Sequence, residues 1–306
     1  MKFFIAVTDN QWHRFLAERH PDELNFWRPG AGAFRVLDEG EPLLFKLHSP
    51  NDYIVGGGFF VRYSVLPLSL AWEAFEQKNG APDFSSFHQQ IAKYRERRGT
   101  MRPDPQIGCI LLTDPFFFEA DDWIPVPRNW SSNIVQGKTY DTEEPIGADV
   151  WDRVQERLAR YRTPYDYLAE SRERYGAEYR TRSRLGQGTF RVLVTEAYQR
   201  RCAVTGQRTL PVLQAAHIKP YAESGPNRVD NGLLLRADLH LLLDKGYMTL
   251  TEDLEVEVSR RIKEDFENGK EYYAMHGQRL QVIPPRDVER PSREFIQWHH
   301  EHRFVG

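Results

Sequence analysis

Four side chains in the last third of the sequence have the types and spacing needed to cut a phosphodiester bond. They are His217, Asn231, His240 and Asp244. A neutral imidazole such as that of His217 can take a proton from an attacking water. On a helix, His240 and Asp244 project from one face and could hold one divalent cation. A cation there would stabilise charge on the phosphate and on the leaving oxygen.

The elements around these residues are expected in the order strand, loop, strand, helix. Residues 212–218 and 233–235 fit two apolar strands, with turn-forming residues between them. Asn231 ends that loop, where its amide would brace the chain and keep His217 oriented. Asp238 fits an N-cap of the following helix and Gly246 fits its end. Taken singly, each histidine also fits a structural role and Asn231-Gly232 fits a turn; their order and spacing favour chemistry.

The stretch from residue 186 to 250 resembles the HNH (ββα-metal) endonuclease family, in the branch with a CAVTG…AAHI…NGL…H…D pattern. The tail to residue 306 follows it more loosely. The resemblance implies that His217 is the general base and Asn231 the orienting asparagine. It also implies that His240 and Asp244 bind one divalent metal ion, Mg²⁺ or Mn²⁺, with Co²⁺ and Ni²⁺ as further candidates.

Two departures from the commoner HNH pattern affect the metal shell and the fold. Many members carry an acid or a histidine just before the general base, where this chain has Ala216. The shell is therefore thinner, and water, phosphate or the nearby Gln214 would complete it. Many members also hold a structural zinc with two CxxC pairs. Cys202 is followed by Ala-Val-Thr, so no structural zinc is expected.

The first 140 residues are dense in short runs with strand character, separated by Pro, Gly and Asn-Asp breaks. Strands are expected at residues 3–7, 42–47, 53–63 and 107–113, and helices at residues 9–18, 69–77 and 84–98. Residues 126–140 have the composition of a loop. This part contains no recognisable catalytic motif, so a binding role is favoured.

The segment LLFKLHSPNDYIVGGGFF and the later LPLSLAWEAF resemble EVE-type members of the PUA superfamily. The resemblance implies a small twisted β-barrel with flanking helices that holds a flipped modified base in an aromatic cage. Stacking surfaces and a few hydrogen-bonding groups suit a flipped cytosine. The candidate lining residues are Phe26, Trp27, Ser49 and Trp130. Alternatively, Phe26 and Trp27 are core or lid residues.

The chain is therefore expected to be an α+β protein in three parts: a recognition domain at residues 1–145, a basic helical connector at 146–185 and the nuclease domain at 186–306. Residues 1–150 hold 15 Lys and Arg against 21 Asp and Glu, a balance of −6, whereas residues 151–201 hold 12 Arg against 7 acids, a balance of +5. The basic stretch fits either DNA phosphates or a solvated helix. Two distant cysteines, Cys109 and Cys202, make no disulfide framework, so a reducing cytoplasm is expected.

The sequence thus predicts a modification-dependent DNA endonuclease of the type IV restriction kind. Its substrate would be double-stranded DNA that contains 5-methyl- or 5-hydroxymethylcytosine. A homodimer is expected for double-strand cuts, because one HNH site cuts one strand. Two alternatives stay open: an HNH nuclease that reads unmodified DNA or nicks it non-specifically, and a non-catalytic DNA-binding protein with a decayed site.

Overall fold

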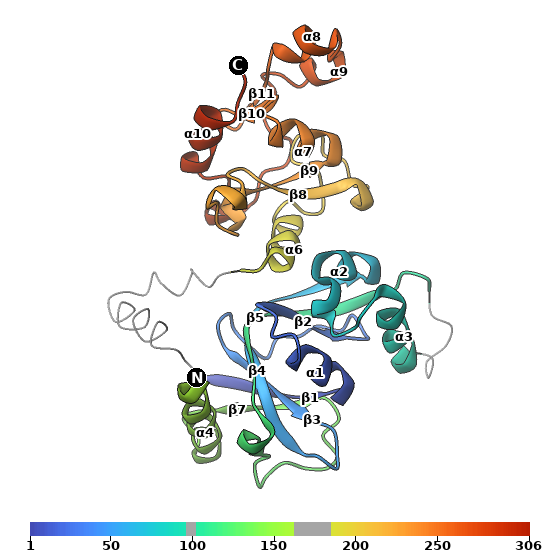
Figure 1. The fold of residues 1–306 in the computed structure, drawn as a ribbon, viewed down its shortest axis with the longest axis vertical. Coiled ribbons are helices and arrows are strands. Elements are labelled where there is room, and N and C mark those ends of the chain that lie inside the picture. The colour runs from blue at the N-terminus through green and yellow to red at the C-terminus, as the bar shows by residue number, and fades with distance from the viewer. Residues whose placement is uncertain (96–101, 162–184) are drawn as a thin grey trace. The chain divides into compact units, whose positions relative to one another are not determined.

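The computed structural model describes residues 1–95, 102–161 and 185–306, and the chain divides into two units, residues 1–183 and 184–306 (Figure 1). The second half of the predicted connector lies outside the described residues. No helix in the described ranges is long and apolar enough to cross a membrane.

The first unit is built on a mixed sheet whose described strands run in the order β2-β5-β4-β3-β1-β7, with a short β6 beside β4. β1 runs parallel to β3, and the other neighbours are antiparallel. The strands are β1 (Lys2–Thr8), β2 (Glu23–Arg28), β3 (Pro42–Leu47), β4 (Tyr53–Pro67), β5 (Gln106–Phe117), β6 (Ile124–Pro125) and β7 (Gly137–Asp141). Neither β2 nor β7 was predicted: β7 does not alternate apolar and polar residues, and β2 buries the polar residues Glu23 and Asn25.

Both faces of this sheet are covered by helices. α1 (Asn10–Ala17) begins at the N-cap Asp9, whose carboxylate accepts hydrogen bonds from two backbone N–H groups, and packs Trp12 on one face with Phe45. α4 (Pro145–Tyr161) packs Val154 on the other face with Leu44. Because neighbouring strand residues alternate between faces, Leu44 and Phe45 serve two different cores. α2 (Leu68–Phe75) and α3 (Phe84–Arg95) complete the unit.

The second unit contains the predicted strand, loop, strand and helix. β8 (Leu213–His217) and β9 (Gly232–Arg236) pair antiparallel with His217 opposite Gly232, and α7 (Ala237–Asp244) follows directly. α6 (Gln187–Ala197) packs so closely on β9 that a Cβ at Gly232 would lie 2.5 Å from Val194. The remaining elements are β10 (Met248–Leu250), β11 (Val256–Val258), α8 (Arg261–Phe266), α9 (Lys270–Tyr273) and α10 (Arg293–His302). The predicted α+β class and the ββα element are confirmed.

The two ends of α7 differ in how well they were predicted. Gly246 ends the helix as expected: its φ is +74°, and a Cβ there would lie 1.9 Å from the Arg303 carbonyl oxygen. The prediction that Asp238 is the N-cap is wrong. α7 begins one residue earlier, and the Asp238 carboxylate instead accepts two hydrogen bonds from Arg236, at 3.0 and 2.5 Å. These charge-assisted hydrogen bonds tie the carboxylate to the guanidinium that precedes the helix.

Candidate functional site

His217 ends β8 with its ring half-buried between two supports. The imidazole stacks on Phe190 of α6, with ring centroids 4.0 Å apart and planes 11° apart. Its Nε2 lies 2.8 Å from Oδ1 of Asn227. Burial lowers the pKa of His217 below its ordinary value, outweighing the effect of the Asn227 contact, which raises it. The ring is therefore neutral at pH 7, as a general base must be.

Asn231 is fully buried and joins the two ends of the loop between β8 and β9. Its Oδ1 accepts from the Lys219 backbone N–H at 2.8 Å, and its Nδ2 donates to the Lys219 and Pro226 carbonyls, both at 3.0 Å. Asn231 thus braces the loop, while the amide that contacts the imidazole belongs to Asn227. The sequence contained no signal for Asn227 beyond its place in a turn-rich loop.

His240 and Asp244 lie one turn apart on α7, with Nε2 of His240 3.3 Å from Oδ2 of Asp244. Two ligands about 2.1 Å from one cation are about 3 Å apart when they subtend a right angle, so this donor pair fits a single divalent ion. Nδ1 of His240 lies 2.8 Å from Oε1 of Gln214 on β8. In the described residues no third His, Cys, Asp or Glu joins the pair, so water or phosphate would complete a shell.

The base and the ligand pair share one electrostatic environment. His240 lowers and Asp244 raises the pKa of His217, although both effects are smaller than that of burial. Charges influence each other in this way only over short range in water and salt. His217 and the ligand pair are therefore close enough to interact electrostatically.

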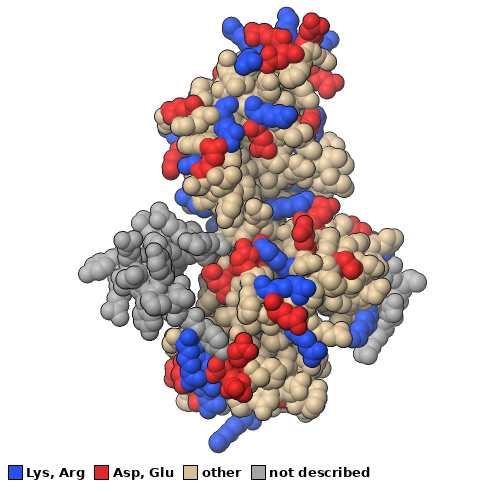
Figure 2. Space-filling view, viewed as in Figure 1, with Lys and Arg blue, Asp and Glu red and all other residues tan. Residues whose placement is uncertain are grey.

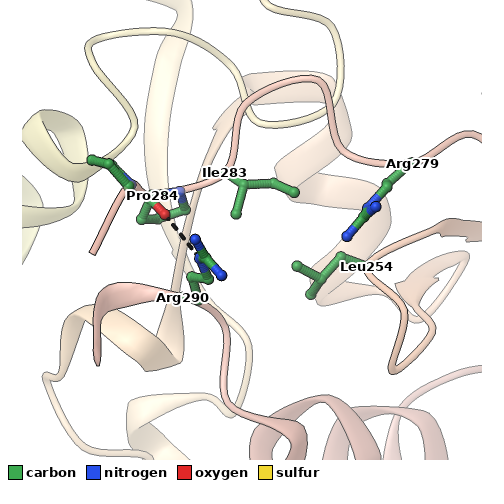
Figure 3. A pocket seen from close by; sticks show the side chains of 6 residues that line it. Leu254, Arg279, Ile283, Pro284 and Arg290 are labelled. Carbon is green, nitrogen blue, oxygen red and sulfur yellow. Dashed lines mark hydrogen bonds between the residues drawn. The ribbon is translucent and has the colours of Figure 1, made fainter. Parts of the chain in front are cut away.

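Two surface depressions lie in the second unit. One, of about 590 Å³, includes Asp244 in its lining, together with Lys245, Tyr247, Phe266, His302 and Arg303. The other, of about 370 Å³, is lined by Leu254, Arg279, Ile283, Pro284, Pro285 and Arg290, with Arg290 bonded to the Pro284 carbonyl (Figure 3). It contains none of the catalytic candidates. On the face in Figure 2 acidic and basic side chains are interspersed.

The four aromatic and polar candidates of the first unit do not meet in one pocket. Phe26 and Trp27 are neighbours on β2 and so project from opposite faces. The Phe26 ring packs against Trp12 and Phe45, whereas the Trp27 indole donates to the Asn79 carbonyl at 2.9 Å and packs against the α3 aromatics Phe87 and Tyr94.

Ser49 and Trp130 belong to a different part of the same unit. Ser49 is exposed in the loop from β3 to β4, and that loop also carries Asp52. Asp52 forms an ion pair with Lys46, whose ammonium is buried and lies 5.3 Å from the centroid of the Trp130 ring. Lys46 was missed because a lysine inside a predicted strand is normally solvent-exposed.

The comparisons with known proteins agree with the geometry of the second unit. Residues 202–251 match the model of the family described as HNH endonuclease. This segment contains His217, Asn231, His240 and Asp244 and ends one residue beyond β10. The predicted HNH endonuclease is confirmed by this match, which lies within the second unit.

Solved structures are also similar to the chain, at TM-scores below 0.5. ASCH from Zymomonas mobilis is 12% identical over 48% of this chain and 94% of its own, with a TM-score of 0.33. The modification dependent TagI restriction endonuclease is 14% identical over 92% of this chain and 75% of its own, with a TM-score of 0.29. No curated protein matches the chain. The nuclease assignment rests on the family match and the site geometry.

Proposed function

We propose that the chain is a modification-dependent DNA endonuclease whose first unit recognises a flipped 5-methyl- or 5-hydroxymethylcytosine and whose second unit hydrolyses the backbone. The single observation that supports the nuclease half is the ββα element that carries His217 on β8 and the His240 and Asp244 pair on α7, within the segment that matches the HNH family. The other half of the proposal, recognition of a modified cytosine, concerns the first unit.

The residues of the site divide the hydrolysis between them. His217 takes the proton from a water that attacks phosphorus, and its neutral, half-buried ring suits that step. Asn231 holds the loop that carries the ring. His240 and Asp244 would hold one divalent ion, Mg²⁺ or Mn²⁺ with Co²⁺ and Ni²⁺ as further candidates. Such an ion neutralises charge on the phosphate and the departing 3′ oxygen.

Base recognition is proposed for the region around Trp130 and Ser49. The Trp130 ring offers a stacking surface, and the partly exposed carboxylate of Asp52 can accept from the exocyclic amine of cytosine. The buried Lys46 ammonium compensates the charge of that carboxylate. Phe26 and Trp27, the other predicted lining residues, pack against core and helix side chains.

A cleavage assay on matched duplexes tests the proposal. Three duplexes of one sequence carry cytosine, 5-methylcytosine or 5-hydroxymethylcytosine, and each is incubated with Mg²⁺, Mn²⁺, Co²⁺ or Ni²⁺. We expect cleavage of modified DNA only. Equal cleavage of all three duplexes would instead indicate a nuclease that reads unmodified DNA. Binding without any nick under all four metals would indicate a decayed site.

Double-strand cleavage also implies a second copy of the chain on the DNA, because one HNH site cuts one strand. We propose a homodimer on the substrate. Sedimentation of the His217→Ala chain with modified duplex should show two chains per duplex, and a single chain per duplex would contradict the dimer.

A further inference from the structure

Two side-chain amides, in addition to the four predicted site residues, face the two histidines of the site. We propose that Asn227 and Gln214 are positioning residues that impose opposite tautomers on His217 and His240. Asn227 would keep the basic lone pair of His217 on Nδ1, and Gln214 would keep that of His240 on Nε2. The inference rests on the proposed nuclease function. The ring nitrogen that carries the hydrogen in each histidine can nevertheless be determined without any cleavage.

The orientation of Asn227 follows from its second contact. Its Nδ2 lies 2.6 Å from the Leu185 carbonyl oxygen, which can only accept a hydrogen bond. The other end of the amide, Oδ1, therefore faces Nε2 of His217 at 2.8 Å and must accept from it. Nε2 then carries the hydrogen, and the lone pair that can take a proton from water lies on Nδ1.

The contact of Gln214 selects the opposite tautomer in His240. Nε2 of His240 is the nitrogen that lies 3.3 Å from the Asp244 carboxylate, so a shared cation needs the lone pair there. The hydrogen must then sit on Nδ1, and the acceptor 2.8 Å from it is Oε1 of Gln214. The exposed Gln214 reaches His240 from β8, the strand that carries His217, so one strand supports both histidines.

An uncharged amide suits both positions. A carboxylate in place of Asn227 would favour the protonated imidazolium and so raise the pKa of His217, which would remove its basic form near neutral pH. A carboxylate in place of Gln214 would strengthen the donor ability of His240 without competing for the cation site, as in carboxylate–histidine–metal arrangements. The two amides are therefore expected to respond differently to conversion into acids.

Nitrogen-15 NMR of the full chain, labelled at histidine, tests the proposal at pH 8, with His217 read in the metal-free chain and His240 read with saturating Mg²⁺, which leaves the lone pair of its Nε2 facing the cation. In the parent chain we expect His217 protonated on Nε2 and His240 on Nδ1. Asn227→Ala should convert the His217 signal to a mixture of tautomers and leave His240 unchanged, and Gln214→Leu should do the reverse. Gln297→Leu, which removes an exposed glutamine bonded to Glu301 on α10, is the matched control and should alter neither.

Calorimetry with Mn²⁺ gives a second readout. Gln214→Leu should weaken Mn²⁺ binding about 10- to 100-fold, the usual loss when a partner of a metal-bound histidine is removed, and Gln214→Glu should restore it. Unchanged tautomers and unchanged Mn²⁺ affinity in both variants would overturn the inference even if the parent chain cuts DNA. The expected tautomers in a chain that cuts no DNA would instead count against the proposed function.

Discussion

His13 in the first unit and His217 in the second are both histidines that burial keeps neutral, yet their surroundings differ. His13 is 7% exposed on α1, and burial lowers its pKa to about 4. Among the residues that the structure describes, its Nε2 has no hydrogen-bond partner. His217 is half-buried, with one nitrogen held by Asn227 and its ring held by Phe190. A lowered pKa therefore accompanies a packed core as readily as a reactive site, and what distinguishes the base is its orientation and accessibility.

The largest expected effect on cleavage comes from removing each imidazole in turn. His217→Ala should reduce the cleavage rate about 10²- to 10⁴-fold, the usual contribution of a general base, while binding of modified duplex is retained. His13→Leu should leave the rate per folded molecule unchanged. Single-turnover cleavage and fluorescence anisotropy measure the two quantities. Equal losses of cleavage in both variants would remove the distinction between the two histidines.

His13 should instead control stability at low pH. Its pKa is about 4 in the folded chain and 6.5 as a model group, so the unfolded chain takes up the proton first as the pH falls. The first unit should lose up to about 3 kcal/mol of stability between pH 6.5 and pH 4. Hydrogen exchange of the β3 and β4 amides measures this, and His13→Leu should flatten the curve. The exposed His20 provides the control: His20→Gln should leave the curve unchanged.

Two half-buried tryptophans of the first unit, Trp27 and Trp130, should differ in their effect on DNA binding. Trp130→Ala should weaken binding of modified duplex by about 1–3 kcal/mol, the cost of losing one base–aromatic stack, and should also lower the melting temperature, because the ring packs on a core cluster. Trp27→Ala should lower the melting temperature, because it removes packing on Phe87. Competition binding and calorimetry separate the two effects. Lost recognition in Trp27→Ala alone would relocate the base site to β2.

The smallest effect concerns the pH profile of cleavage. His217 acts in its neutral form, and burial lowers its pKa below the ordinary 6.5. The acid limb of kcat/KM should therefore fall below pH 6.5, so activity persists where an exposed histidine would already be protonated. Asn227→Asp should move that limb to higher pH. A limb above 6.5 in the parent chain would mean that another group limits the rate.

The nuclease site could be predicted because its residues lie in one stretch of 28 residues, from His217 to Asp244, that forms a single local element. A strand, a loop, a strand and one helix turn have standard dimensions, so spacing alone places His240 and Asp244 on one face. The contacts of Asn227 and Gln214 depend on which way loop and strand side chains turn, and spacing does not contain that information. Composition predicted the β-rich first unit, but β2 was missed because Glu23 and Asn25 are buried against the rule that polar residues face solvent.

The hydrogen bond from Asn227 to the Leu185 carbonyl extends the nuclease unit by residues that its hydrophobic core does not require. α6 begins at Gln187, and its packing residues Phe190 and Val194 come later still. A chain shortened to begin at Gly186 would keep those contacts and could melt normally, yet Asn227 would be free to rotate its amide. The functional boundary of this domain therefore includes Leu185, because its carbonyl orients the Asn227 amide that holds the hydrogen on His217. A truncation that removes Leu185 would reduce activity while it leaves the fold intact.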